Sequence, residues 1–147
     1  MADYLIDTNV LLRRIDLNSP QRPIARRALR ILRAQGHTLC ITPQNVIEFW
    51  NVATRPTTAR GGLGLDTTLA DRKVQPLERI FTLLSDLPTI YSEWRRIVVA
   101  HAVQGVQVHD ARLVAAMTVH GVSHILTFNA DDFACYPGIA AVNPHDV

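Results

Sequence analysis

The stretch Tyr4-Leu5-Ile6-Asp7-Thr8-Asn9 decides the fold prediction, because it joins a short apolar run directly to a helix-capping sequence. Tyr4, Leu5 and Ile6 form an unbroken apolar run of the kind found in buried strands. An Asp at the following position is a favoured helix cap, since its carboxylate accepts hydrogen bonds from free N–H groups. We therefore expect a strand that ends at Asp7 and passes directly into a helix.

Apolar runs and helical stripes alternate along the rest of the chain. Thr42 followed by Pro43 is typical of a helix start, with a capping residue and then a first-turn proline. Asp110 is expected to cap the last helix, which should end at Gly121. The spacing of apolar residues predicts helices over 24–32, 43–55, 77–84 (after Pro76), 94–101 and 110–120, and strands over 39–41, 124–127 and 139–142, with 89–91 as a further strand candidate.

Short apolar strands that alternate with helices indicate a parallel sheet covered by helices on both faces. The chain of 147 residues shows no internal repeat, low-complexity tract or dividing linker. We therefore expect one three-layer α/β/α domain over residues 1–147.

Composition excludes several classes of protein. Hydrophobic residues make up 48% of the chain and charged residues 19%, which is typical of a globular protein. No apolar run approaches the roughly 20 residues of a membrane helix, and the acidic N-terminus does not resemble a signal peptide. Cys40 and Cys135 are far apart and fit no disulfide framework or zinc spacing. We expect a cytoplasmic protein that does not bind membranes.

Acidic residues fall where the strands of such a sheet should end. Asp7 follows the first strand, Glu48 lies in the helix after the second, and Asp110 opens the helix before the fourth. The turn Asn129–Asp132 follows that fourth strand. Open parallel sheets carry their sites at the carboxyl ends of the strands, so these residues are expected to meet at one edge.

Each acidic residue also has a purely structural explanation. Asp7 and Asp110 can serve as helix caps, Glu48 as a solvated surface residue, and Asn129–Asp132 as an ordinary turn. If the carboxylates do converge, two of them about 4 Å apart repel by roughly 4 kcal/mol at an effective dielectric constant of about 20. A bound cation would offset that repulsion, and oxygen-only ligands favour Mg²⁺ or Mn²⁺.

Basic residues are almost all Arg, since Lys73 is the only Lys among the 15 basic residues. A set of them recurs at intervals of three or four residues, so it should share one helix face, either as a solvated surface or as a contact for phosphate groups or a protein partner. This set is Arg22, Arg26, Arg30 and Arg33. The histidines show no ligand spacing and are interpreted as structural; they include His101, His109 and His120.

Segments of the chain resemble those of PIN-domain proteins, and above all the VapC-type toxins of bacterial toxin–antitoxin pairs. The similar segments are 5–12 (LIDTNVLL), 43–50 (PQNVIEFW), 109–116 (HDARLVAA) and 125–133 (ILTFNADDF). They occur in the order found in that family, and together the resemblance extends over almost the whole chain.

The resemblance implies a central parallel sheet of four or five strands and a Mg²⁺-dependent endoribonuclease that leaves 5′-phosphate and 3′-hydroxyl ends. It also implies RNA and a cognate antitoxin as partners, and a homodimer. By position, Asp7 and Asp110 would be the main metal ligands and Glu48 would complete the acidic triad.

The family position that often holds a fourth Asp is Asn129 here. Either Asn129 holds a metal-bound water or Asp132 supplies the catalytic charge. Thr8 and Asn9 would hold Asp7 or a phosphate near the helix N-terminus.

Other classes of protein remain as alternatives. An aspartyl-phosphate phosphatase or receiver also has an Asp after its first strand, but Asn9 stands where those enzymes usually have a second Asp. A PIN domain that binds RNA or protein without catalysis would lack the chief acids, which are present here. The Gly61–Gly64 loop lacks the Gly-Lys-Ser/Thr ending of a nucleotide-binding P-loop.

Overall fold

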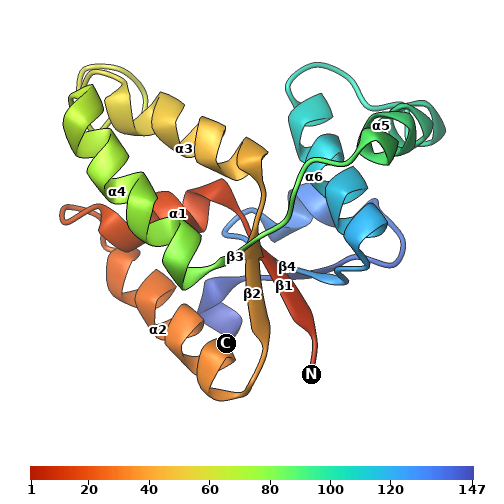
Figure 1. Ribbon diagram of the computed structural model, residues 1–147, viewed down its shortest axis with the longest axis horizontal. Helices are drawn as coiled ribbons and strands as arrows, with labels where there is room; N and C mark the ends of the chain where they lie inside the picture. Colours follow the sequence, from red (N-terminus) through yellow and green to blue (C-terminus); the bar gives the residue numbers. More distant parts are fainter.

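A parallel five-stranded sheet forms the centre of the molecule in the computed structural model, which describes residues 1–147 (Figure 1). The strand order is β3-β2-β1-β4-β5, and every neighbouring pair is parallel. The strands are β1 (Asp3–Ile6), β2 (Thr38–Ile41), β3 (Thr82–Leu83), β4 (His124–Leu126) and β5 (Ala140–Val142).

Helices cover both faces of the sheet (Figure 1). One face carries α1 (Thr8–Ile15), α2 (Arg22–Ala34), α3 (Pro43–Thr54) and α4 (Thr67–Ile80). The other face carries α5 (Pro88–Ala100) and α6 (Gln107–His120). Two short 3₁₀ helices, η1 (Ala130–Phe133) and η2 (Pro144–Asp146), follow β4 and β5. None of the helices is long and apolar enough to span a membrane.

The central strands supply apolar side chains to two separate cores. Tyr4 and Ile6 of β1 pack into the core beneath α1–α4, whereas Leu5 packs into the core beneath α5 and α6. In β4, Leu126 and Ile125 are divided in the same way. This alternation follows from the two-residue period of a strand, and it explains why β1 is apolar without interruption.

The predicted three-layer α/β/α class with a parallel sheet is confirmed, and the sheet has five strands. One strand was placed wrongly, because residues 89–91 lie in α5 and not in a strand. Pro88 occupies the first turn of that helix, where its missing N–H costs nothing. The edge strand is instead Thr82–Leu83, which pairs with Cys40 and Ile41 of β2.

Two helix starts also differ from the sequence prediction. Pro76 lies inside α4, which begins at Thr67 with Asp66 as its cap; the Asp66 carboxylate accepts a hydrogen bond from Leu69 N at 2.8 Å. Phe81 ends that helix and does not continue its apolar stripe. Asp110 does not cap α6, because the helix begins at Gln107 and Asp110 lies within its first turn.

The order in which strands are added to the sheet reverses at β1. Strands β2 and β3 extend the sheet to one side of β1, and β4 and β5 extend it to the other. The carboxyl ends of β1 and β4 therefore lie at the switch point where open α/β sheets form their sites. Asp7 and Thr127 are the residues that directly follow these two strands.

Candidate acidic site

Asp7 is buried at the end of β1, where only 7% of the residue is exposed. Its carboxylate caps α1 by accepting a hydrogen bond from Thr8 N at Oδ1, at 2.8 Å. Oδ2 accepts a second hydrogen bond from the Thr127 hydroxyl at 2.7 Å. Burial raises the pKa of Asp7, the bonds from Thr127 and Thr8 lower it, and the charge of Asp132 raises it again. Asp7 therefore is a helix cap and also part of an electrostatically coupled group.

The Thr127 hydroxyl uses its full hydrogen-bonding capacity at this site. It donates to Asp7 and accepts from the Asn129 backbone N–H at 3.0 Å and from Asn9 Nδ2 at 3.3 Å. A hydroxyl has one donor and two acceptor positions, so all three are filled. Asn9 Oδ1 also accepts from Phe128 N at 3.3 Å, which ties α1 to the turn after β4. Asn9 thus acts on Asp7 through Thr127.

Glu48 reaches the site from α3. Its Oε1 accepts a hydrogen bond from the Thr8 hydroxyl at 3.0 Å, and the same hydroxyl accepts from Asn45 Nδ2 at 3.2 Å. Asn45 is fully buried and forms a capping box with Thr42 at the start of α3. Burial raises the pKa of Glu48, the Thr8 bond lowers it, and the charge of Asp7 raises it. Glu48 is therefore a half-buried member of the acidic group.

Asp110 faces the group from α6, on the opposite side of the sheet. Burial raises its pKa to about 7, with further contributions from the charges of Asp7, Asp132 and Glu48. A carboxyl group normally titrates near 4, so burial and the neighbouring charges make Asp110 hold its proton to a higher pH than an ordinary Asp when no cation is present. The largest cause is loss of solvation, and the three neighbouring carboxylates add to it.

Asp132 lies exposed in η1 and supplies the fourth charge of the group, since it raises the pKa of both Asp7 and Asp110. Asn129 is also exposed, and its backbone N–H is bonded to Thr127. The structure thus brings Asp7, Glu48, Asp110 and Asp132 together from four distant segments. Asn129 contributes to this arrangement through its backbone N–H.

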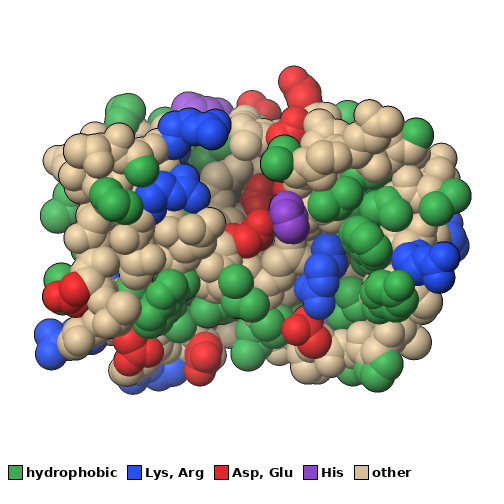
Figure 2. Space-filling model, turned by 90° about the horizontal axis from the view of Figure 1, so that it is seen from above, with side chains coloured by type: hydrophobic (Ala, Val, Ile, Leu, Met, Phe, Trp, Pro, Cys, Tyr) green, Lys and Arg blue, Asp and Glu red, His purple; other side chains and the backbone are tan.

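The two helical layers are linked beside the acidic group. Gln44 of α3 donates through Nε2 to the His109 carbonyl at 2.7 Å and accepts from Arg112 of α6 at 3.2 Å. Arg112 also pairs with Asp86 at 3.3 Å. Figure 2 looks down on this edge of the sheet and shows acidic side chains in a central hollow with a His side chain beside them. These contacts fix the separation of the two walls of the hollow.

The histidines differ in their surroundings. His101 contacts the Tyr136 ring with centroids 5.2 Å apart, and His120 Nε2 lies 2.8 Å from the Ser85 carbonyl, so both have structural contacts. His109 is exposed, and its charge lowers the pKa of Glu48. His109 is therefore the histidine nearest to the acidic group in electrostatic terms.

The donor chemistry of the acidic group fits a hard divalent cation. Its side chains offer only oxygen ligands, and their mutual repulsion is what a bound cation would offset. Asp7, Asp110 and Glu48 are the residues that would hold such an ion. As they stand, no group of three or more His, Cys, Asp or Glu side chains is arranged to hold a metal ion. The acidic group therefore suits a divalent cation in the type of its ligand atoms and in its charge.

A large hollow lies away from the acids. It has a volume of about 770 Å³ and lies between α2, the end of α1 and α4. Arg22 and Arg26 of the predicted basic helix face line this hollow, and Arg30 and Arg33 line a second one of about 400 Å³ beside it. The predicted Arg set therefore lines these two hollows, with Arg22 half-buried and Arg26, Arg30 and Arg33 exposed.

Sequence reasoning missed several residues that build the site: Thr127, Asn45, Gln44 and Arg112. Thr127 had a usable signal, because it directly follows the apolar run Ile125–Leu126 and lies two residues before the Asn129–Asp132 turn. The other three lie on helix faces whose orientation only the packed structure shows.

The sequence model of the PIN domain matches residues 4–138 of the chain. A comparison with curated protein sequences finds no match. Solved structures do match at the level of the fold. VapBC2 of Rickettsia felis, bound to a promoter DNA fragment, has a TM-score of 0.71 and 12% identity, covering 96% of this chain and 98% of that chain.

Two further structures are similar over most of their length. A toxin–antitoxin complex of Klebsiella pneumoniae has a TM-score of 0.64 and 22% identity, covering 98% of this chain and 99% of that chain. VapC20 of Mycobacterium tuberculosis, a sarcin–ricin loop cleaving toxin, has a TM-score of 0.65 and 15% identity, covering 89% and 93%. At these identities the structures show a shared fold, while the sequence model extends over most of the chain. The chain therefore belongs to the PIN domain family.

Proposed function

We propose that this protein is a Mg²⁺-dependent endoribonuclease and the VapC-type toxin of a toxin–antitoxin pair. One observation carries the proposal: Asp7, Glu48, Asp110 and Asp132 come from four distant segments, and at the switch point of the sheet their charges, together with burial, raise the pKa of Asp7, Glu48 and Asp110. Structural needs alone do not explain this, because a cluster of carboxylates costs stability. The fold shared with toxin structures supports the proposal.

Asp7 and Asp110 would hold the metal ion, with Glu48 as the third acidic ligand. When bound, Mg²⁺ supplies charge stabilisation for hydrolysis of a phosphodiester bond; Mn²⁺ can replace it. The Thr127 hydroxyl and Thr8 N–H hold the Asp7 carboxylate in one orientation. Asp132 would contribute the fourth charge, in place of the Asp that Asn129 replaces.

Glu48 would also accept the proton of the attacking water. The Thr8 hydroxyl donates to its Oε1 at 3.0 Å, which fixes the orientation of the Glu48 carboxylate for this role. Hydrolysis by activated water does not need the RNA 2′-hydroxyl. The expected ends are a 5′-phosphate and a 3′-hydroxyl, as the family resemblance implies.

An antitoxin partner, a homodimeric assembly and a cytoplasmic location belong to the same proposal. The antitoxin partner is supported by solved structures of the same fold that contain toxin–antitoxin pairs, whereas the homodimer follows from the family resemblance. The partner is expected to be a small protein encoded next to this one. Co-expression of the two should yield a stable complex without nuclease activity, and free toxin should sediment as a dimer.

The activity is tested by incubating the purified chain with total cellular RNA in Mg²⁺, Mn²⁺ or EDTA. Asp7→Asn and Asp110→Asn should each lower the cleavage rate by at least about a hundredfold. Asp71→Asn is the matched control, because Asp71 is exposed on α4 and its carboxylate accepts a hydrogen bond only from Gln75, on the same helix. Cleavage that survives EDTA or either site substitution would overturn the proposal. Absence of cleavage, together with absence of Mg²⁺ binding, would favour a non-catalytic PIN domain.

A further inference from the structure

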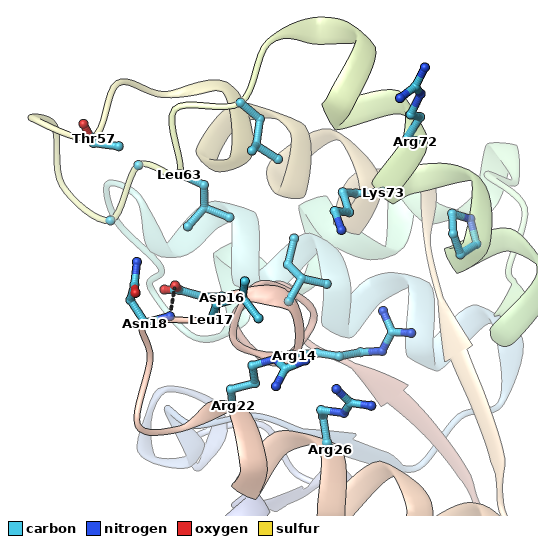
Figure 3. Close-up of a pocket in the computed structure, with 15 residues that line it drawn as sticks. Arg14, Asp16, Leu17, Asn18, Arg22, Arg26, Thr57, Leu63, Arg72 and Lys73 are labelled. Carbon is cyan, nitrogen blue, oxygen red and sulfur yellow. Dashed lines mark hydrogen bonds between the residues drawn. The ribbon is translucent and has the colours of Figure 1, made fainter.

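The hollow between α2 and α4 is lined by an excess of positive charge. Arg14, Arg22, Arg26, Arg72 and Lys73 line it, whereas Asp16 is the only acidic residue in its lining. Figure 3 shows the side chains of Arg14, Arg22, Arg26 and Lys73 directed toward the same space, while Arg72 points away from it. The structure has two ion pairs, Arg96–Glu93 and Arg112–Asp86, and neither includes a residue of this hollow.

The cations of the hollow are not neutralised by the protein itself. Arg22 Nε is buried and has no hydrogen-bond partner, which leaves a donor without compensation. Burial lowers the pKa of Arg14, and the charges of Arg26 and Arg33 lower it further. Like-charged guanidinium groups held this closely are stabilised when an anion binds between them. The lining therefore favours an anionic ligand.

The shape of the basic surface favours a long ligand over a single small anion. Arg14 and Arg26 line both the large hollow and the neighbouring one, which adds Arg30 and Arg33 along α2. The two hollows therefore adjoin at Arg14 and Arg26, and together we call them the basic groove. Guanidinium groups bind phosphate oxygens in a bidentate manner, so a chain of phosphates matches this spacing better than one carboxylate does.

One wall of the basic groove is held rigidly by backbone bonds. The loop after α3 folds back on the end of that helix, with Leu63 N bonded to the Val52 carbonyl at 3.2 Å and Gly64 N to the Arg55 carbonyl at 2.8 Å. Gly62 packs so closely that an added Cβ would lie 2.1 Å from the Pro56 carbonyl oxygen. The wall is therefore preformed, which reduces the entropy cost of binding.

The basic groove and the acidic site are joined by α1. Asp7 caps the start of α1, and Arg14 lies in its last turn. A helix of this length spans only about 12 Å, so the Arg14 end of the basic groove lies about one length of α1 from Asp7. We propose that the basic groove binds backbone phosphates of single-stranded RNA adjacent to the scissile bond. The choice of RNA as the phosphate-containing ligand rests on the proposed nuclease function.

Binding is tested apart from cleavage, using the full chain with Asp7→Asn, in EDTA, and a fluorescent single-stranded RNA of about sixteen nucleotides. In that background we compare Arg26→Gln/Lys73→Gln, which removes exposed cations from opposite walls, with Arg79→Gln/Arg95→Gln. The control pair removes the same charge from exposed positions outside both hollows.

The groove variant should bind RNA about tenfold to a hundredfold more weakly, and the control variant less than about threefold more weakly. The slope of log K against log salt concentration should fall by about 1.4 in the groove variant, since each lost phosphate contact removes about 0.7. Equal weakening in both variants would show a general charge effect and overturn the inference. Unchanged RNA affinity with lost binding of the partner protein would assign the basic groove to an acidic protein segment, and would also overturn it.

Cleavage by the otherwise unaltered chain distinguishes this inference from the proposed function. If the groove variant cleaves RNA in Mg²⁺ with the same KM as the unaltered chain, the nuclease proposal stays intact and the basic groove is rejected as an RNA site. Groove-dependent RNA binding without cleavage under any metal would reject the nuclease proposal and retain the groove.

Discussion

Thr127 is the residue on which the geometry of the acidic site depends most directly. Its hydroxyl is buried, holds Oδ2 of Asp7, and receives hydrogen bonds from the turn after β4 and from Asn9. A buried carboxylate without such a donor pays the full cost of lost solvation. The position of one hydroxyl thus controls both the orientation and the charge of Asp7.

Replacing Thr127 with Val removes the hydroxyl at nearly constant volume. We expect a loss of about 2 kcal/mol in the free energy of unfolding at pH 7, because the bond to a charged buried group is lost. The loss should be smaller at pH 4, because burial raises the pKa of Asp7 and so makes it gain its proton more readily than an ordinary Asp as the pH falls. Urea unfolding at the two pH values measures this. Thr127→Ser keeps the hydroxyl and should lose much less; a loss of equal size in both variants would contradict the assigned bond.

The raised pKa of Asp110 predicts a pH-dependent stability in EDTA. Its pKa is near 4 when unfolded and about 7 when folded, so the unfolded chain releases this proton first as pH rises. Stability is therefore lost from about pH 4 to pH 7. Asp110→Asn should match the parent protein at pH 4 and have a higher melting temperature above pH 7. A difference in melting temperature between the two proteins that stays the same at every pH would contradict the raised pKa of Asp110.

At the scale of single elements, the starts of α1 and α3 set the positions of the acids. Asp7 caps α1, and the Thr42–Asn45 capping box starts α3. The Asn45 amide also donates a hydrogen bond to the Thr8 hydroxyl, which in turn donates to Glu48. The capping preferences at these two helix starts therefore also position the carboxylates of Asp7 and Glu48. At the opposite end of α3, the tight loop that contains Gly62 builds the wall of the basic groove.

Gly62→Ala should destabilise that loop. The added Cβ would lie 2.1 Å from the Pro56 carbonyl oxygen and 2.5 Å from that of Arg55, so backbone must move. We expect a loss of about 1–3 kcal/mol in the free energy of unfolding, as for other overpacked sites. Thr58→Ala, an exposed change in the same loop, should stay within about 0.5 kcal/mol. A Gly62→Ala protein as stable as that control would show that the loop has room to relax.

Across the whole molecule, the acidic site lies where the two helical layers meet. Asp7 and Glu48 belong to the layer of α1–α4, and Asp110 belongs to the layer of α5 and α6 (Figure 1). The layers pack on opposite faces of the sheet in separate cores. A cation held by all three carboxylates would therefore link the layers and stabilise the entire fold.

Mg²⁺ should accordingly raise the melting temperature of the protein. At a concentration about a hundred times the Kd, the gain in unfolding free energy is about 2.7 kcal/mol. The double variant Asp7→Asn/Asp110→Asn should lose this gain, whereas Asp71→Asn should keep it. Equal stabilisation by Mg²⁺ in all three proteins would mean that the ion binds elsewhere.

The sequence by itself determined the class of fold and the identity of the acids. Uninterrupted apolar strands such as Tyr4–Ile6 predict a sheet buried on both faces, and a strand followed at once by a capping Asp places that Asp at the sheet edge. Local signals gave wrong predictions where two of them conflict. Pro76 is compatible with the first turn of a helix, yet that helix begins ten residues earlier, at its cap Asp66. Residues Thr89–Tyr91 are compatible with a strand, yet they follow Pro88, which starts a helix.

Only the tertiary structure decided how distant segments meet. The bonds from Thr127 to Asp7, from Thr8 to Glu48 and from Arg112 to Gln44 join residues 120, 40 and 68 positions apart, and no local pattern encodes such pairs. The basic groove likewise needs α1, α2 and α4 side by side before Arg14 and Lys73 line the same hollow. Periodicity and capping are local properties of a chain, whereas burial, mutual repulsion and raised pKa values arise from packing.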